Sequence, residues 1–208
     1  MYAMRSKLFY GIAFSLLTSH FSLSQVVINE YSCSNVNSFT DNFAQYEDWI
    51  ELYNTTASAV NITGWHLSDK KTNPTKWTFG AVSIPASGFV RVWASGRNIN
   101  SGFMHANFKL TQCKPEAIVL ADAAGVIIDS LTLKPAQAGH SRGRTTNGAP
   151  TWSVFLTPTP SASNTNPYQE YATRPTMSVA AGFYAATQNV TITSPDPKPS
   201  ARIIKLGP

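Results

Sequence analysis

The sequence predicts an all-β protein: an immunoglobulin-like antiparallel β-sandwich followed by a partial second β-domain. Short extended runs in which apolar and polar residues alternate recur along the chain, and turn residues separate them at close intervals. From residue 25 onward, no window sustains the apolar i, i+3, i+4, i+7 spacing of an amphipathic helix over several turns. Roughly seven to nine short strands over about 140 residues are typical of an immunoglobulin-type sandwich.

The stretch at residues 48–54, Asp-Trp-Ile-Glu-Leu-Tyr-Asn, predicts the strand around which the rest of the domain packs. Because side chains alternate along a strand, Trp49 and Glu51 share one face while Ile50 and Leu52 share the other. Both faces carry bulk, which favours an interior strand with Trp49, Ile50 and Leu52 in the core. Glu51 then needs a partner if its face is covered.

The first strand is expected at residues 26–31, before a polar loop. Gly64 predicts a bulge or bend between two short extended runs, and Trp65, which follows it, is a further candidate core residue. Proline and glycine in residues 85–88 fit a tight turn between hairpin strands, and residues 122–125 fit a second hairpin turn. The remaining strands are expected at residues 60–62, 65–67, 77–79, 82–84, 89–93, 103–110, 117–120, 126–128 and 152–155.

Residues 1–24 have the pattern of a secretory signal peptide. Two basic residues, Arg5 and Lys7, precede an apolar run at 8–17, and small residues at 22–24 offer a cleavage site. The apolar run is shorter than the roughly 20 residues that a membrane-spanning helix needs, which disfavours the alternative of a membrane anchor. We therefore expect a secreted or cell-surface protein without a transmembrane span after cleavage of the signal.

The charge balance argues against nucleic acid as a partner. The chain has 16 basic and 11 acidic residues, and removal of Arg5 and Lys7 with the signal leaves 14 basic residues and a balance of +3. The basic residues are scattered, whereas a nucleic-acid-binding face needs a clustered stripe. With 43% hydrophobic and 12% aromatic residues, the chain can instead fill a core of its own.

Cys33 and Cys113 are the two cysteines of the chain, so one pairing is available. Export permits a disulfide, which would close a loop of about 80 residues and contribute roughly 4 kcal/mol in the chain-entropy model. Two small buried thiols fit the sequence equally well, because sequence does not show whether the two Cβ atoms meet. Neither cysteine is expected to be a nucleophile.

The sequence offers no clear catalytic or metal-binding constellation. His66, His105 and His140 have no cysteine or other histidine at a close metal-ligand spacing. A Ser-His-Asp triad is not excluded by composition, but serine-rich loops of a secreted sandwich are usually turns. We expect no enzymatic activity, no cofactor and no metal. The tryptophans are expected mostly in the core, with a sugar-binding aromatic platform as the alternative.

Three acidic residues, Glu30, Asp48 and Glu51, are expected to lie near one another because they fall on neighbouring strands. Paired carboxylates can perform acid-base chemistry or hold calcium. We instead expect a structural ion pair between Glu51 and a late-loop cation, either Arg142 or Arg144, through charge-assisted hydrogen bonds. The reason is that a buried carboxylate without compensation is costly.

Three early segments, at residues 27–30, 48–54 and 62–69, resemble the opening of a bacterial lamin-tail domain. Six later segments agree with successive signatures of that family; they lie at residues 84–89, 107–110, 121–125, 128–130, 141–144 and 157–164. The resemblance covers about residues 25–166. It implies an immunoglobulin-like sandwich that serves as an accessory or interaction module in exported bacterial proteins, without catalysis of its own.

From about residue 167 to residue 208, the chain resembles the first half of the small β-domain at the C-terminal end of chitobiases and β-hexosaminidases. The resemblance is carried by residues 174–178, 182–184 and 190–193. The Tyr-Thr-x-Asp-Gly continuation of that family is absent, so we expect an incomplete, loosely paired domain and further domains downstream in a longer protein. In exported proteins such a pairing sometimes precedes a domain that resembles the spore-coat-protein-H kinases.

The sequence therefore predicts a non-catalytic interaction or positioning module of an exported or cell-surface bacterial protein. Its partner is expected to be a protein or a surface glycan. The alternative is an accessory segment that holds substrate for a larger secreted hydrolase, nuclease or spore-coat-protein-H-like kinase protein. Fold class alone does not separate these hypotheses, because sandwiches host many functions.

Overall fold

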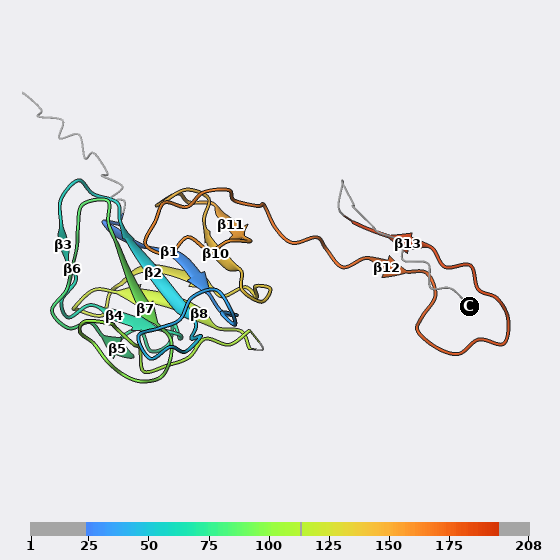
Figure 1. The fold of residues 1–208 in the computed structure, drawn as a ribbon, viewed down its shortest axis with the longest axis horizontal. Helices are drawn as coiled ribbons and strands as arrows, with labels where there is room; N and C mark the ends of the chain where they lie inside the picture. Colours follow the sequence, from blue (N-terminus) through green and yellow to red (C-terminus); the bar gives the residue numbers. More distant parts are fainter. Residues whose placement is uncertain (1–23, 113, 196–208) are drawn as a thin grey trace, which may run out of the picture.

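The computed structural model describes residues 24–112 and 114–195, and every regular element within these ranges is a β-strand. Two antiparallel sheets pack face to face around an apolar core (Figure 1). The predicted all-β class and the immunoglobulin-like sandwich are confirmed. Apart from Ser24, the expected signal peptide lies outside the described residues. Within the described ranges there is no helix that could cross a membrane.

The first sheet has five strands in the order β11-β10-β1-β2-β7, and the second has four in the order β5-β4-β8-β9. The strands of the first sheet are β1 (Val26–Ser32), β2 (Trp49–Asn54), β7 (Phe89–Trp93), β10 (Ser141–Arg144) and β11 (Trp152–Phe155). Those of the second sheet are β4 (His66–Ser68), β5 (Trp77–Thr78), β8 (Ala117–Ala121) and β9 (Ile127–Thr132). Two short pairs are β3 (Val60–Asn61) with β6 (Ser83–Ile84), and β12 (Thr176–Met177) with β13 (Ile192–Thr193).

Strand β2 lies at the centre of the module because it pairs with β1 on one side and with β7 on the other. Its alternation agrees with the prediction. Ile50 and Leu52 belong to the core between the sheets and are fully buried. Trp49 and Glu51 point to the opposite face, yet each of them is also 0% exposed. The first sheet is therefore covered on both faces at β2.

A β-bulge in β1 determines what lies on that second face. The pairing of β1 with β2 shifts between Ile28 and Glu30, which inserts Asn29 as an extra residue. Ile28 and Tyr31 both belong to the apolar core, whereas Asn29 and Glu30 are buried outside it. The bulge thus places two consecutive polar side chains on the same side of the sheet as Glu51.

Two details of the predicted strands are wrong. The strands on either side of residues 85–88 do not form a hairpin, because β6 pairs with β3 while β7 pairs with β2. The expected strand at 103–110 is a loop with isolated bridges, in which His105 pairs with both Trp93 and Ile99. The candidate core residue Trp65 packs against the core but is only partly buried.

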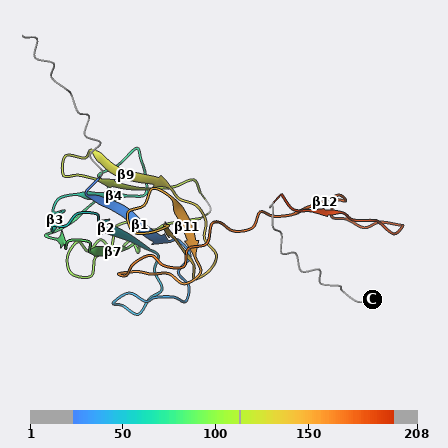
Figure 2. The same ribbon diagram turned by 90° about the horizontal axis from the view of Figure 1, so that it is seen from above.

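The pair β12-β13 stands apart from the sandwich in both views of the molecule (Figures 1 and 2). Its strands are two residues long and exposed, and Phe183 in the connection between them is 109% exposed. A single two-stranded pair buries too little surface to be independently stable. Residues 168–171, by contrast, contact the sandwich, as described below.

Trp49→Ala is expected to lower the free energy of unfolding by about 3–5 kcal/mol, because it removes a fully buried aromatic side chain and leaves a cavity. Thermal and chemical denaturation followed by circular dichroism measures the loss. Trp65→Ala is the matched control, since it removes the same atoms from a partly exposed position and should lower stability less. Equal melting temperatures for Trp49→Ala and the parent would contradict the core position of Trp49.

Chymotrypsin is expected to cut the chain first after Phe183 or Tyr184, because both side chains are exposed and the surrounding pair of strands opens easily. Mass spectrometry of the earliest fragments locates the cuts. Cleavage after the buried residues Trp49 or Phe155 should follow only with global unfolding. Cleavage at Trp49 as rapid as at Phe183 would contradict this order.

Candidate functional site

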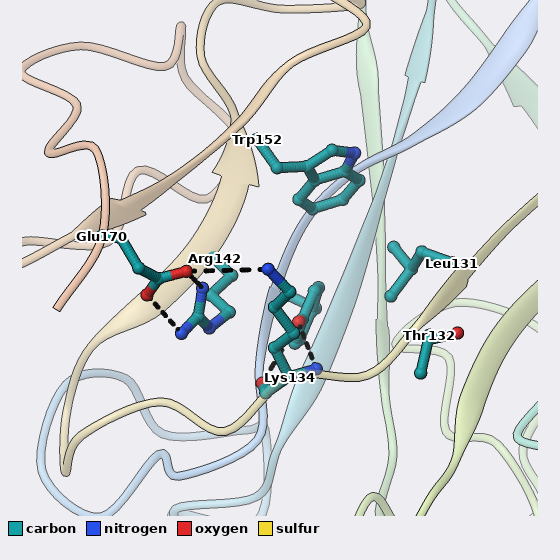
Figure 3. A pocket seen from close by; sticks show the side chains of 7 residues that line it. Leu131, Thr132, Lys134, Arg142, Trp152 and Glu170 are labelled. Carbon is teal, nitrogen blue, oxygen red and sulfur yellow. Dashed lines mark hydrogen bonds and ion pairs between the residues drawn. The ribbon is translucent and has the colours of Figure 1, made fainter. Parts of the chain in front are cut away.

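The candidate functional site is a cavity of about 190 Å³ where the open edge of the first sheet meets β9 and the chain that follows it. Its walls combine aromatic, apolar, cationic and acidic side chains (Figure 3). The lining residues are Tyr31, Leu131, Thr132, Lys134, Arg142, Trp152 and Glu170. Strands β1, β9, β10 and β11 contribute to it, and Glu170 enters from the segment that leaves the sandwich.

Arg142 is the buried cation that lines this cavity. It is only 8% exposed, and its Nε donates to the carbonyl oxygen of Pro135 at 2.6 Å. Its Nη1 and Nη2 donate to the two carboxylate oxygens of Glu170 at 3.0 and 2.7 Å. This is the two-pronged geometry in which a guanidinium binds a carboxylate most strongly. The backbone contact through Nε holds the guanidinium in place for it.

Tyr31 and Trp152 form the aromatic wall, with ring centroids 5.8 Å apart. The Tyr31 hydroxyl donates to the carbonyl oxygen of Lys134 at 3.2 Å and accepts from the Lys134 amide at 3.0 Å. Burial raises the pKa of Tyr31, so its hydroxyl stays neutral. The backbone at Lys134 is thereby fixed beside the cavity, while the lysine side chain reaches toward Glu170.

Glu170 supplies the acidic group of the site. Its side chain is 46% exposed, and Lys134 Nζ lies 3.7 Å from its Oε2 (Figure 3). The hydrogen bonds from Arg142 lower the pKa of Glu170 to about 2, which keeps the carboxylate charged near neutral pH. Arg142 and Lys134 therefore hold an anionic group of the same chain, the Glu170 carboxylate, beside this cavity.

The residues around Glu170 are also attached to the sandwich, and we refer to residues 168–171 as the docking segment. Tyr168 and Val154 on β11 exchange two backbone hydrogen bonds of 2.8 Å each. The Tyr171 hydroxyl accepts from the Gln137 amide at 3.0 Å and lies 3.1 Å from His140 Nδ1. The rings of Tyr171 and His140 stack at 5.9 Å.

The predicted ion pair between Glu51 and Arg142 or Arg144 is wrong. Arg142 binds Glu170, and Arg144 Nη2 lies 2.8 Å from Asp129 Oδ2 on β9. The reason is the alternation along β10. Ser141 contacts Glu30 on the face that carries Glu51, so the arginines that flank Gly143 point to the other face. The cation nearest to Glu51 in register is Arg91 on β7, which a pairing of residues 48–54 with 89–93 could have indicated.

Glu30 and Glu51 lie side by side on neighbouring strands, both fully buried. Glu30 accepts hydrogen bonds from the Ser141 hydroxyl, from the Thr159 amide at 2.9 Å and from the Thr159 hydroxyl at 2.8 Å. Glu51 accepts from the Ser161 amide and from Asn29 Nδ2 at 3.3 Å. Among the residues that the structure describes, neither glutamate forms an ion pair.

Asn164 completes the cover over these carboxylates, and we call residues 159–164 the covering segment. Asn164 Nδ2 donates to the carbonyl oxygen of Arg144 at 2.6 Å, and Asn164 Oδ1 accepts from Asn29 Nδ2 at 3.2 Å. The Asn164 amide donates to Asn147 Oδ1 at 2.9 Å. The carboxylates are thus enclosed by neutral donors, which leaves no open position for a substrate or a calcium ion.

Burial raises the pKa of both glutamates, and that of Glu51 rises to about 8. The charge of Glu30 adds to the effect on Glu51, while the bonds from Ser161 and Asn29 oppose it. Glu30 has more donors, which favours its charged form over that of Glu51. Asp48 lies apart from the pair: it accepts from the Asn35 amide at 3.0 Å, and burial raises its pKa to about 6.

Residues 139–143 spell Gly-His-Ser-Arg-Gly, a Gly-x-Ser-x-Gly pattern that the sequence reasoning overlooked. A catalytic serine of this pattern sits exposed on a sharp turn between a strand and a helix. Ser141 instead begins strand β10, is fully buried and donates its hydroxyl to Glu30. Ser141 therefore serves as one of the hydrogen-bond donors to the buried Glu30 carboxylate.

A second apparent catalytic group surrounds His105. Its Nδ1 lies 2.9 Å from Ser95 Oγ and 4.0 Å from Asp41 Oδ2, and its Nε2 lies 2.8 Å from Asn42 Oδ1. In a Ser-His-Asp triad, the serine and the carboxylate contact opposite ring nitrogens. Here both face Nδ1, and burial lowers the pKa of His105. These contacts tie the loop after β1 to the chain after β7.

The remaining candidates are accounted for separately. His66 Nδ1 lies 3.0 Å from the Thr78 hydroxyl on the neighbouring strand. Cys33 is a free, buried thiol that lies 3.6 Å from the Lys134 carbonyl, and burial raises its pKa to about 11. Because Cys33 is free, the structure does not form the predicted bridge and agrees with the alternative of a buried thiol; Cys113 itself lies outside the described residues. Within residues 24–112 and 114–195, no three His, Cys, Asp or Glu residues are placed to hold a metal ion.

Comparison with protein families finds that residues 20–135 match the model of the Lamin Tail Domain, more than half of the chain. No curated protein matches the chain. The family match ends before β10, although β10 pairs with β1 in the same sheet. The structural unit therefore includes two strands, β10 and β11, that follow the matched region.

Glu51→Gln is expected to make stability less dependent on pH. Burial raises the pKa of Glu51 from 4.5 in the unfolded chain to about 8 in the folded protein. The stabilisation that the neutral Glu51 side chain gives the folded state is therefore complete below pH 4.5 and is lost as the pH rises through 8. The loss is on the order of a few kcal/mol. Glutamine keeps an oxygen for the Ser161 amide and has no proton to lose. Chemical denaturation between pH 5 and 9 measures the slope.

Asp122→Asn is the matched control for this experiment, since it makes the same change from acid to amide in an exposed turn. It should leave the pH dependence of unfolding close to that of the parent. Some slope should persist in Glu51→Gln because burial also raises the pKa of Glu30 and Asp48. An identical pH dependence of unfolding for Glu51→Gln and the parent would contradict the raised pKa of Glu51.

Proposed function

The chain belongs to the lamin tail domain family, and from this premise we propose that it is a non-catalytic interaction or positioning module of an exported protein. The family is an immunoglobulin-like, non-enzymatic one. The proposal goes further than family membership because it assigns binding to a particular surface. That surface is the cavity formed by Tyr31, Arg142 and Trp152 at the edge of the sandwich.

The observation that carries the proposal is that some ionisable groups are enclosed and bind other parts of the sandwich, whereas the carboxylate at the Arg142 cavity lies at its surface. Glu30 and Glu51 are enclosed and hold the covering segment, and His105 is enclosed and holds a loop. The cavity at Arg142 differs from both, because a buried guanidinium and an aromatic wall there face a carboxylate that is half exposed. Such a combination supports recognition of an anionic partner group, while nothing in it activates a nucleophile.

Export belongs to the same proposal and rests on the sequence. The basic residues Arg5 and Lys7, followed by the apolar run at 8–17, are the features that support it. Fusion of residues 1–24 to a reporter enzyme that is active only outside the cytoplasm tests this part, with Arg5→Glu combined with Lys7→Glu as its control. A fusion that stays inside the cell would contradict it.

We further propose that residues 167–208 form part of a small β-domain like that at the C-terminal end of chitobiases and β-hexosaminidases. The features that support this are the residues of the resemblance, 174–178 and 190–193, and the antiparallel pairing of β12 with β13 within them. In that setting the sandwich positions the domain that follows it. A substrate-holding role beside a secreted hydrolase, nuclease or kinase domain would use the same cavity.

The full chain is expected to bind acidic ligands on combined peptide and glycan arrays, and to turn over none of them. Arg142→Gln and Trp152→Ala should each weaken binding about tenfold or more, because each removes a charged hydrogen-bond donor or an aromatic contact of the cavity. Arg174→Gln is the matched control, since it removes a cation from the exposed segment beyond the cavity. Melting curves verify that each variant folds.

Hydrolysis of any array ligand by the purified chain, or binding that survives both cavity substitutions, would contradict this proposal. The first result would indicate an enzyme, and the second would move the binding surface to another part of the sandwich. Binding that depends equally on Arg174 and Arg142 would indicate non-specific attraction of acidic ligands to a positively charged chain.

A further inference from the structure

We propose that the edge of β11 and the cavity at Arg142 form a docking site for an extended acidic peptide of a partner protein, with the docking segment, residues 168–171, as its resident occupant. This inference rests on the interaction function proposed above and specifies the ligand class. The occupant shows which chemical features the site recognises, because each of its contacts is made by a separate structural element.

The first feature is an extended backbone. β11 is an edge strand of the first sheet, so one row of its backbone groups faces away from β10 and can pair with another segment of chain. Val154 uses both its N–H and its carbonyl group to bind Tyr168, each at 2.8 Å. Addition of a strand to a sheet edge is a general mode of peptide recognition, in which backbone bonds supply affinity and side-chain pockets supply specificity.

The second feature is a carboxylate two residues further along the peptide. Glu170 reaches Arg142 through two hydrogen bonds and lies 3.7 Å from Lys134 Nζ. The guanidinium is buried and already anchored to the Pro135 carbonyl, so binding does not require it to be ordered first. Its planar fork matches a carboxylate in a way that a lysine in its place would not.

The third feature is an aromatic residue next to the acid. Tyr171 stacks on His140 with an interplanar angle of 20°, and its hydroxyl accepts from the Gln137 amide. The recognised element is therefore an extended chain with an acid followed directly by an aromatic residue. An acidic glycan could satisfy Arg142 alone, whereas the bonds to Val154 require a peptide backbone, so the geometry favours a peptide.

The occupant is more exposed than the site that receives it. Tyr168 is 53% exposed and the Glu170 side chain 46%, while Arg142 and Tyr31 are buried. The docking segment can therefore leave without opening the core, and an equivalent peptide can take its place. Attachment in the same chain gives the resident segment an effective concentration in roughly the millimolar range, so a partner peptide must outcompete it.

The test measures binding of a fluorescent peptide with the sequence of residues 166–173, Asn-Pro-Tyr-Gln-Glu-Tyr-Ala-Thr, to the full chain by anisotropy. Glu170→Gln in the chain weakens the resident segment and should tighten binding of the peptide about tenfold over the parent, as expected for loss of charged hydrogen bonds in the competitor. A peptide with Gln in place of its Glu should bind this variant at least about tenfold more weakly.

Arg142→Lys in the Glu170→Gln chain provides the second arm, because it keeps the charge and removes the fork. It should reduce the preference for the Glu peptide over the Gln peptide, and Lys109→Gln, on a different surface, should leave that preference unchanged. Equal binding of both peptides, absence of saturable binding, or tighter binding of an oligogalacturonate would overturn the proposal. If the peptide proposal fails in this way but ligands from the arrays still lose binding in Arg142→Gln, the interaction function proposed above is supported and only the peptide specificity is wrong.

Discussion

The burial of two carboxylates on one face of the first sheet is the constraint on which the rest of the module depends. Glu30 and Glu51 are adjacent on β1 and β2, and neither touches solvent. A buried carboxylate needs hydrogen-bond donors, and these come from residues far along the chain, Thr159 and Ser161. The carboxylates on β1 and β2 therefore need the covering segment, which follows them by more than 100 residues. A sandwich that ended with the family match at residue 135 would leave both carboxylates uncovered.

Strand β10 links this cover to the cavity because its two faces carry opposite chemistry. Ser141 meets Glu30 on one face, while Arg142 and Arg144 lie on the other, where they bind Glu170 and Asp129. Between them, Gly143 leaves the space that the cover occupies: a Cβ there would lie 3.0 Å from Asn164 Nδ2 and 3.1 Å from Glu30 Cγ. A single four-residue strand thus holds two separate parts of the C-terminal chain.

Much of the fold, but little of the site, follows from local sequence patterns. Period-two alternation identified Ile50 and Leu52 as core residues and required that the face of Glu51 be covered, because alternation depends only on neighbouring residues. The partners of Glu51 and Arg142 depend on register between distant strands and on a bulge at Asn29, which alternation does not encode. The same limit explains why the strand expected at 103–110 is wrong: residues of this stretch form isolated bridges to Trp93 at the end of β7 and to the loop after it, and they do not form a ladder.

The position of Glu170 explains why local sequence patterns did not predict the site. Glu170 lies in a polar stretch with the composition of a linker, and its partner Arg142 is 28 residues away in the sequence. Which face of the sheet Arg142 occupies depends on the register of β10 with β1, which local sequence does not determine. The covering segment and the docking segment differ in whether the groups that they bind are enclosed or can be reached from the surface. The covering segment satisfies enclosed acids, so its removal would expose them to water, whereas the docking segment satisfies Arg142 from the surface. A group held in the second way can exchange with a partner, and a group held in the first way cannot do so without unfolding the sheet that it covers.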